Sequence, residues 1–147
     1  MAGIWQSLAI SQSGMDVEQL RAEVAARNIA NANVAAAPGA VLAKPLRVVV
    51  QPVGAAFGQA LSRAESDQPP PGGVRAAVVE SDAPARKVLD PSSPLADAQG
   101  YVQYAGVNTL EEMFAMTMAV RSYEANVTAF NAARSMMQKA LDIGGKQ

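Results

Sequence analysis

The sequence predicts a mainly α chain, with a long amphipathic helix at each end and an irregular, β-containing insert between the two helices. Apolar residues recur at helical spacing near both termini, and these stretches contain no proline. All nine prolines and most of the eleven glycines fall within residues 33–106. We therefore expect a helical assembly segment at 1–32, a β- and loop-rich insert at 33–106 and a second helical assembly segment at 107–147, with the helices packed as a coiled-coil-like pair.

The first helix is expected over residues 4–31 and is apolar on two sides. One seam consists of Ile4, Leu8, Met15, Ala22, Ala25 or Ala26, and Ile29. The other consists of Ile10, Val17, Leu20 and Val24. Gly14 weakens the middle by roughly 1 kcal/mol relative to alanine, so a bend or a division there is an open alternative. A helix that is apolar over more than half of its circumference needs neighbours on more than one side.

The last helix, expected from about residue 109 to 142, carries the stronger pattern. Its large apolar residues alternate at three- and four-residue steps over about four heptads, and Arg134 is the one interruption. The seam consists of Met113, Met116, Val120, Tyr123, Val127, Phe130, Met137 and Leu141. We interpret the methionines of this helix as packing residues rather than as a metal site, because thioether side chains adapt to irregular neighbours.

The ends of this helix have recognisable signals. Asn108 with Glu111, or Thr109 with Glu112, fits a capping box at its start. Gly144-Gly145 is expected to stop it. Between the two helices, runs of β-forming residues at 46–50, 74–79 and 100–104 predict short strands, and the proline- and glycine-rich run at 68–73 predicts a loop.

Composition argues against catalysis. The chain has no cysteine and no histidine, which excludes thiolate nucleophiles, imidazole bases and the commonest zinc ligands. Glu111 and Glu112 are adjacent and diverge around a helix, and Gly54–Gly58 lacks the lysine of a phosphate-binding loop. We expect no catalytic residue, no cofactor, no metal and no small-molecule substrate.

Charge and hydropathy exclude further classes of partner. The 12 basic and 13 acidic residues nearly balance, so neither nucleic acid nor an anionic membrane is an expected partner. The sequence contains no run of about 18 apolar residues, so no membrane span is predicted. The N-terminus has no basic region ahead of an apolar core, so a cleaved signal peptide is not expected.

Three motifs resemble the bacterial flagellar rod, hook and hook-associated axial proteins. Asn28-Ile-Ala-Asn-Ala32, at the end of the first helix, is similar to the Asn-Leu-Ala-Asn-Ala signature of that family. The stretch from Asp90 to Val102 resembles the segment that leads into the last helix of its proximal-rod members. Arg121-Ser-Tyr-Glu-Ala-Asn-Val127 fits the same helix. The insert, with Pro69–Pro71, matches the family poorly.

The resemblance implies a structural subunit of the flagellar basal body, in the proximal rod that crosses the periplasm and serves motility. Family members are exported by the flagellar type III apparatus without a cleaved signal. Their terminal helices pack with other rod proteins and with copies of themselves into a helical assembly, a tube that transmits torque and lines the export channel. The interface residues expected here are Leu8, Met15, Leu20, Val24, Asn28, Ile29, Asn31, Met113, Met116, Val120, Tyr123, Asn126, Val127, Phe130, Met137 and Leu141.

Two alternatives stay open at this stage. The chain could be another axial subunit of the rod or hook. It could also be a helical secretion adaptor or chaperone that holds one client helix against its C-terminal heptads.

Overall fold

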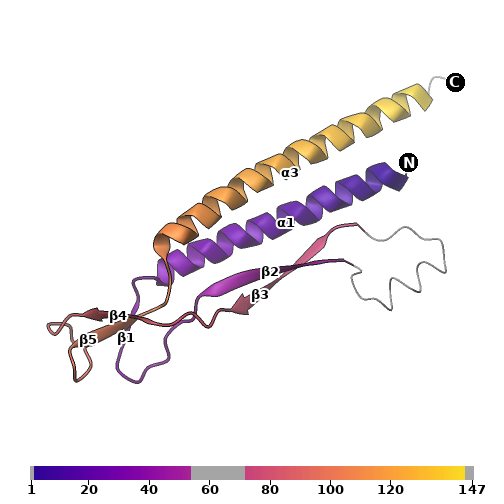
Figure 1. Cartoon of the computed structure of the whole chain (residues 1–147). Helices are drawn as coiled ribbons and strands as arrows, with labels where there is room; N and C mark the ends of the chain where they lie inside the picture. The colour runs from indigo at the N-terminus through magenta and orange to yellow at the C-terminus, as the bar shows by residue number, and fades with distance from the viewer. Residues whose placement is uncertain (1, 54–71, 145–147) are drawn as a thin grey trace, which may run out of the picture. The chain divides into compact units, whose positions relative to one another are not determined.

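The computed structural model describes residues 2–53 and 72–144 (Figure 1). Its elements in chain order are α1 (Ala2–Asn31), β1 (Ala35–Ala36), β2 (Leu46–Pro52), β3 (Val74–Glu80), β4 (Arg86–Leu89), β5 (Tyr101–Tyr104) and α3 (Thr109–Gly144). Two long terminal helices with a β-containing middle region confirm the predicted fold class. The coiled-coil form of their pairing stays a prediction.

The first helix, α1, continues without a break through Gly14. A Cβ atom at this position would lie 2.9 Å from the side-chain nitrogen of Asn126. Gly14 therefore marks a close approach of α3 to α1, and the division into two helices considered from the sequence does not occur.

The last helix begins after an asparagine cap. The side-chain oxygen of Asn108 accepts a hydrogen bond from the backbone nitrogen of Leu110 at 3.2 Å, and its carbonyl accepts one from the nitrogen of Glu112 at 3.1 Å. The helix reaches Gly144, while Gly145 lies outside the described residues. Of the two capping alternatives, the structure selects Asn108 as the cap, and the Glu112 side chain is bonded elsewhere.

The predicted strands are all present, and two further strands join them. A three-stranded antiparallel sheet has the order β1-β5-β4, with Ala35 opposite Tyr104 and Val88 opposite Val102. Val102 on the central strand is fully buried. β1 and β4 were not predicted because neither is long or alternating enough to show a two-residue period.

The second sheet is the two-stranded ribbon of β2 and β3. Hydrogen bonds from Ser81 N to Pro45 O at 2.7 Å and from Val53 N to Gly73 O at 3.1 Å indicate that the strands are antiparallel. Lys44 donates to Asp82 beside the ribbon, and this hydrogen bond raises the pKa of Lys44. Of the loop predicted at 68–73, residues 68–71 lie outside the described residues.

The chain divides into two compact units, and each includes part of both helices. The first unit comprises Met1–Leu20, Val50–Ala77 and Ala119–Gln147, and the second comprises Arg21–Val49 and Val78–Met118. Buried residues described in the first unit are Ser11, Val17, Ala119 and Ala133. Buried hydrophobic residues described in the second are Val24, Ala25, Ala32, Val102 and Ala105. Small side chains dominate both cores, which brings the backbones of the packed elements close together.

Candidate assembly interface

Asn28 joins three elements within the second unit. It lies on the last full turn of α1 and is 2% exposed. Its side-chain oxygen accepts a hydrogen bond from Leu46 N at 2.8 Å, and its side-chain nitrogen donates to Leu46 O at 2.9 Å and to Glu112 Oε1 at 3.0 Å. Asn28, Leu46 and Glu112 form what we call the asparagine clamp, which holds the start of β2 and the first turn of α3 against α1.

The chemistry of the clamp requires an amide. An asparagine side chain supplies both an acceptor and two N–H donors, so it can bond to the N–H and the C=O of Leu46 as a neighbouring strand would. An aspartate at position 28 would lose both donors and place a carboxylate beside Glu112. The first asparagine of the Asn28–Ala32 motif is thus a connecting residue, whereas the second, Asn31, is exposed.

The first unit has a comparable polar connection at Ser13. Its hydroxyl donates to Ile10 O at 2.8 Å and accepts from Val74 N at 3.1 Å, which ties β3 to α1. The backbone passes close to the helix here: Gly73 has a φ of 120°, and a Cβ atom on it would lie 2.8 Å from the Ser13 hydroxyl oxygen. Sequence reasoning missed this connection.

The contact surface of α3 with α1 is displaced from the predicted heptad seam. Glu112 bonds to Asn28, Asn126 lies against Gly14, and Ala119 and Ala133 are buried. These four α3 residues recur every seven positions. They precede the predicted seam positions 113, 120, 127 and 134 by one residue, which is about 100° around a helix. We call Glu112, Ala119, Asn126 and Ala133 the inward set of α3. Its signal in the sequence was the regular spacing of small and polar residues rather than of large apolar ones.

The expected interface residues differ in burial. On α1, Val24 and Asn28 are buried, Leu8, Met15, Leu20 and Ile29 are half-buried, and Asn31 is exposed. On α3, the half-buried ones are Met116, Asn126, Val127, Phe130 and Met137, and the exposed ones are Met113, Val120, Tyr123 and Leu141. Their role in contacts between subunits stays a prediction.

Further large apolar side chains of α3 are exposed beside these predicted ones. We call the exposed large apolar residues of this helix the outer apolar set; its members are Leu110, Met113, Phe114, Met118, Val120, Tyr123, Met136, Leu141 and Ile143. Sequence reasoning missed Leu110, Phe114 and Ile143 because they lie off the heptad seam. A surface this rich in large apolar residues is typical of an interaction site.

An arginine connects the three-stranded sheet to the end of α1. The Arg86 guanidinium lies 5.0 Å from the centre of the Tyr104 ring and donates to Ala32 O at 3.4 Å. The short β4 strand is thereby held near the motif that carries Asn28. No local sequence signal announces this contact, because the partners are 54 residues apart.

Features of other protein classes are not found in the described part of the chain. None of its helices combines the length and apolarity that crossing a membrane requires. Residues 2–53 and 72–144 also contain no group of three or more acidic, histidine or cysteine side chains able to hold a metal ion.

Comparison with known sequences places this architecture in the class of flagellar rod proteins. A family profile described as "Flagellar basal body rod FlgEFG protein C-terminal" matches residues 98–143, which include β5, the asparagine cap and nearly all of α3. The match covers the part of the chain that contains the outer apolar set.

Relatives that match nearly the whole chain identify the particular family. The chain is 40% identical to flagellar basal-body rod protein FlgC of Salmonella typhimurium over 92% of this chain and 93% of that protein. It is 36% identical to FlgC of Bacillus subtilis, over 95% and 97%, and 32% identical to FlgC of Borreliella burgdorferi, over 96% and 97%. The chain belongs to the FlgC family of flagellar basal-body rod proteins. These relatives are named as rod proteins and not as enzymes, and the family expected from the motifs is confirmed.

Proposed function

We propose that this chain is a subunit of the proximal rod whose outer apolar set packs against neighbouring rod subunits and further copies of itself. Membership of the FlgC family supports a basal-body rod location. The observation that carries the interface is the exposure of large apolar side chains along α3, including Phe114 at 64% and Val120 at 47%. In the assembled rod these side chains are buried by the helices of adjacent subunits.

The proposed assembly accounts for torque transmission. Each buried leucine- or methionine-sized side chain contributes roughly 1.5–3 kcal/mol, so a subunit that buries several of them on each side resists displacement. Repeated around a tube of terminal helices in coiled-coil-like contact, these contacts give a stiff shaft whose inner wall lines the export channel.

The proposed organisation assigns a role to each segment of the chain. Segments 1–32 and 107–147 form the assembly layer, and the insert at 33–106 faces outward. The subunit reaches the periplasmic space through the flagellar type III apparatus without a cleaved signal peptide. The family relationship is the support for both the segment roles and the export route.

Substitution of Val120 tests the interface. Val120→Asp leaves the isolated chain folded, because the side chain is already half exposed, but puts an unpaired charge at the centre of the subunit contact, at a cost of several kcal/mol. We expect the variant to be absent from purified basal bodies and the cells to be non-motile. Val120→Leu, which keeps the apolar character, is the matched control and should assemble. Normal motility with Val120→Asp would remove this residue from the interface.

Cryo-electron microscopy of purified basal bodies tests the location directly. Density for both terminal helices in the inner wall of the rod is the expected result. Intact rods that lack this chain would contradict the proposal and favour the adaptor or chaperone alternative.

A further inference from the structure

Each of the two sheets has an edge strand that is exposed in the second unit. β4 lies at one end of the strand order β1-β5-β4, and all four of its residues are exposed. β3 pairs with β2, and Val78, Val79 and Glu80 at its end are exposed as well. The outer side of an edge strand presents a row of backbone N–H and C=O groups, to which a strand of another molecule can be added.

A hydrogen bond next to β4 identifies which of its backbone groups point outward. Asp90, the residue after β4, donates its N–H to Gly100 O at 2.9 Å, so these two residues form a hydrogen-bonded pair. Bonded and non-bonded positions alternate along an antiparallel ladder. Leu89 and Lys87, one and three positions before Asp90, are therefore non-bonded, and their N–H and C=O groups point away from β5.

The same alternation applies to the ribbon of β2 and β3. Ser81 donates its N–H to Pro45 O at 2.7 Å, which makes them a hydrogen-bonded pair. The next pair, Leu46 and Glu80, is non-bonded, and the hydrogen bonds that both backbone groups of Leu46 make to α1 agree with this assignment. The N–H and C=O groups of Glu80 and Val78 therefore point away from β2.

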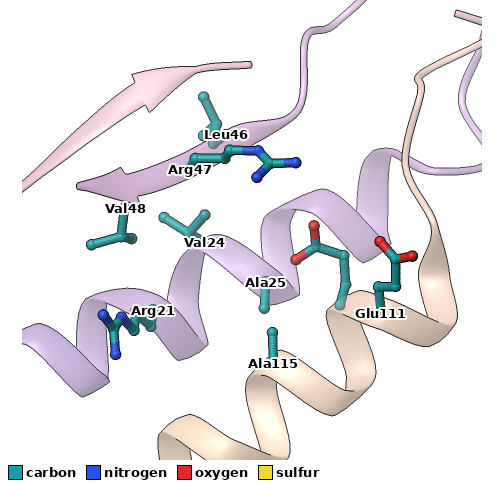
Figure 2. Close-up of a pocket in the computed structure, with 9 residues that line it drawn as sticks. Arg21, Val24, Ala25, Leu46, Arg47, Val48, Glu111 and Ala115 are labelled. Carbon is teal, nitrogen blue, oxygen red and sulfur yellow. The ribbon is translucent and has the colours of Figure 1, made fainter. Parts of the chain in front are cut away.

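The helix α1 lies at a different edge of the ribbon in each unit. In the first unit, the Ser13 hydroxyl accepts a hydrogen bond from Val74 N at the edge of β3. In the second unit, α1 lies at the β2 edge: the asparagine clamp holds the start of that strand, and Figure 2 shows Val48 of β2 beside Val24 of α1. The end of β3 thus keeps an open edge in the second unit.

The open edges of β3 and β4 are complementary to each other. In an antiparallel pairing, the outward groups of Lys87 can bond to those of Glu80 while the outward groups of Leu89 bond to those of Val78. Lys87 then lies opposite an acidic residue. Leu89, which is 61% exposed, lies opposite Val78, which is 43% exposed. Opposite charges and apolar side chains that face each other directly across a ladder both stabilise the pairing.

Pairing of two like edges lacks this match. Between two β4 edges, Lys87 would lie opposite Leu89 or a second Lys87. Between two β3 edges, Glu80 would lie opposite an apolar residue or a second Glu80. Like charges directly opposite each other are destabilising, so the pairing of unlike edges is favoured.

We propose that β4 of one copy of this chain pairs in antiparallel orientation with the end of β3 of a second copy, with Lys87 opposite Glu80 and Leu89 opposite Val78. Within one chain the two strands belong to separate sheets, so the partner edge comes from another molecule. The contact is heterologous, and contacts of this kind continue from subunit to subunit. The inference rests on the proposed rod function and deepens it, because it gives the insert at 33–106 a role in contacts between copies.

Disulfide trapping in assembled rods is the direct test, since so short a ladder is not expected to hold two free subunits together. The chain has no cysteine, so the thiols of a Val78→Cys/Leu89→Cys variant are its only ones. Residues opposite each other in such a pair have Cα atoms about 5.5 Å apart, which suits a disulfide. Mild oxidation of purified basal bodies should yield disulfide-linked dimers and larger multimers of the chain.

The matched control for trapping is Val79→Cys/Leu89→Cys. Val79 is as exposed as Val78, at 42%, but adjacent side chains of a strand point to opposite faces of the sheet. The control should therefore give markedly fewer multimers under the same oxidation.

Charge reversal tests the register of the pairing. Lys87→Glu and Glu80→Lys should each lower the amount of chain in purified basal bodies by roughly three- to tenfold, because each places like charges opposite each other. The double variant restores opposite charges and should recover most of the incorporation. Lys87→Glu is the more specific single variant, because Glu80 also lies near Lys44 of its own chain.

The outcomes separate this inference from the rod function on which it rests. Rods that contain the Val78→Cys/Leu89→Cys chain but yield only monomers overturn the strand pairing and leave the rod function intact. Normal incorporation of Lys87→Glu contradicts the pairing of Lys87 with Glu80 and likewise leaves the rod function intact. Absence of even the wild-type chain from intact rods overturns both.

Discussion

The two terminal helices bury different kinds of residue. α1 buries Val17 and Val24 together with the polar Ser11 and Asn28. Among its described residues, α3 buries only Ala119 and Ala133, and its large apolar side chains are half-buried or, in the outer apolar set, exposed. The helix with the stronger heptad pattern is thus the one that uses its large residues least within the subunit.

Under the proposed function, this difference separates the residues that fold the subunit from the residues that assemble it. Within each unit α1 holds one strand of the ribbon: Ser13 bonds to Val74 of β3 in the first unit, and Asn28 bonds to Leu46 of β2 in the second. α3 meets α1 at Glu112 and Asn126, and its buried residues are the small Ala119 and Ala133, whereas its outer apolar set is exposed in the subunit. Substitutions that affect stability and substitutions that affect assembly should therefore fall on different faces.

The largest effect on stability is expected at the asparagine clamp. Asn28→Ala leaves the N–H and C=O of Leu46 without their partner in a part-buried site, which should destabilise the fold by about 2–4 kcal/mol. Asn31→Ala, in the same motif but exposed, should change stability by less than about 0.5 kcal/mol. Urea unfolding of both variants is the measurement. Equal urea midpoints for Asn28→Ala and Asn31→Ala would show that the clamp does not stabilise the subunit.

The next effect is expected from overpacking the inward set of α3. Ala133→Leu adds volume at a buried position and should destabilise the chain by about 1–3 kcal/mol. The neighbouring Ala132 is exposed, so Ala132→Leu changes stability by less than about 0.5 kcal/mol. Thermal unfolding compares the two. A larger loss for Ala132→Leu would mean that the wrong face of α3 has been assigned inward.

A smaller effect of opposite sign is expected at Gly14. Alanine is favoured over glycine in a helix by roughly 1 kcal/mol, but its Cβ must displace the Asn126 side-chain amide. Gly14→Ala alone should therefore stabilise by less than that amount. In an Asn126→Ala background, Gly14→Ala should raise the free energy of unfolding by nearly the full amount. If instead the effects of the two substitutions on the free energy of unfolding simply add, the Gly14–Asn126 contact is contradicted.

The smallest effect on stability is expected in the outer apolar set. Phe114→Ser removes a side chain that is 64% exposed, so the free energy of unfolding should change by less than about 0.5 kcal/mol. Its incorporation into basal bodies should nevertheless fall, because the ring is lost from the proposed contact with neighbouring subunits. Loss of stability without loss of incorporation would reverse the roles assigned to the two faces of α3.

Local pattern was sufficient for most of the architecture. The helices at 4–31 and 109–142 were predicted to within two residues at each end, because hydrophobic period and cap residues act over a few positions. The runs at 46–50, 74–79 and 100–104 became β2, β3 and β5 for the same reason. The motif around Asn28 also singled out a residue that proved to be buried and bonded.

Other features depended on contacts between distant residues. β1 and β4 exist because β5 lies between them, and neither two nor four residues form a strand alone. Local rules made Glu112 a candidate capping residue, but its carboxylate accepts from Asn28, 84 positions away.

The sequence by itself therefore determined where the two helices and the strands β2, β3 and β5 lie, and which residues are apolar enough to favour burial. Tertiary structure alone decided which of those residues are covered within the subunit. The spacing of apolar residues indicates only that their side chains favour burial. The hydrophobic effect is non-directional, so a side chain gains the same free energy whether its neighbour belongs to the same chain or to another one. The one-residue displacement between the predicted seam of α3 and its inward set of Glu112, Ala119, Asn126 and Ala133 follows from that limit.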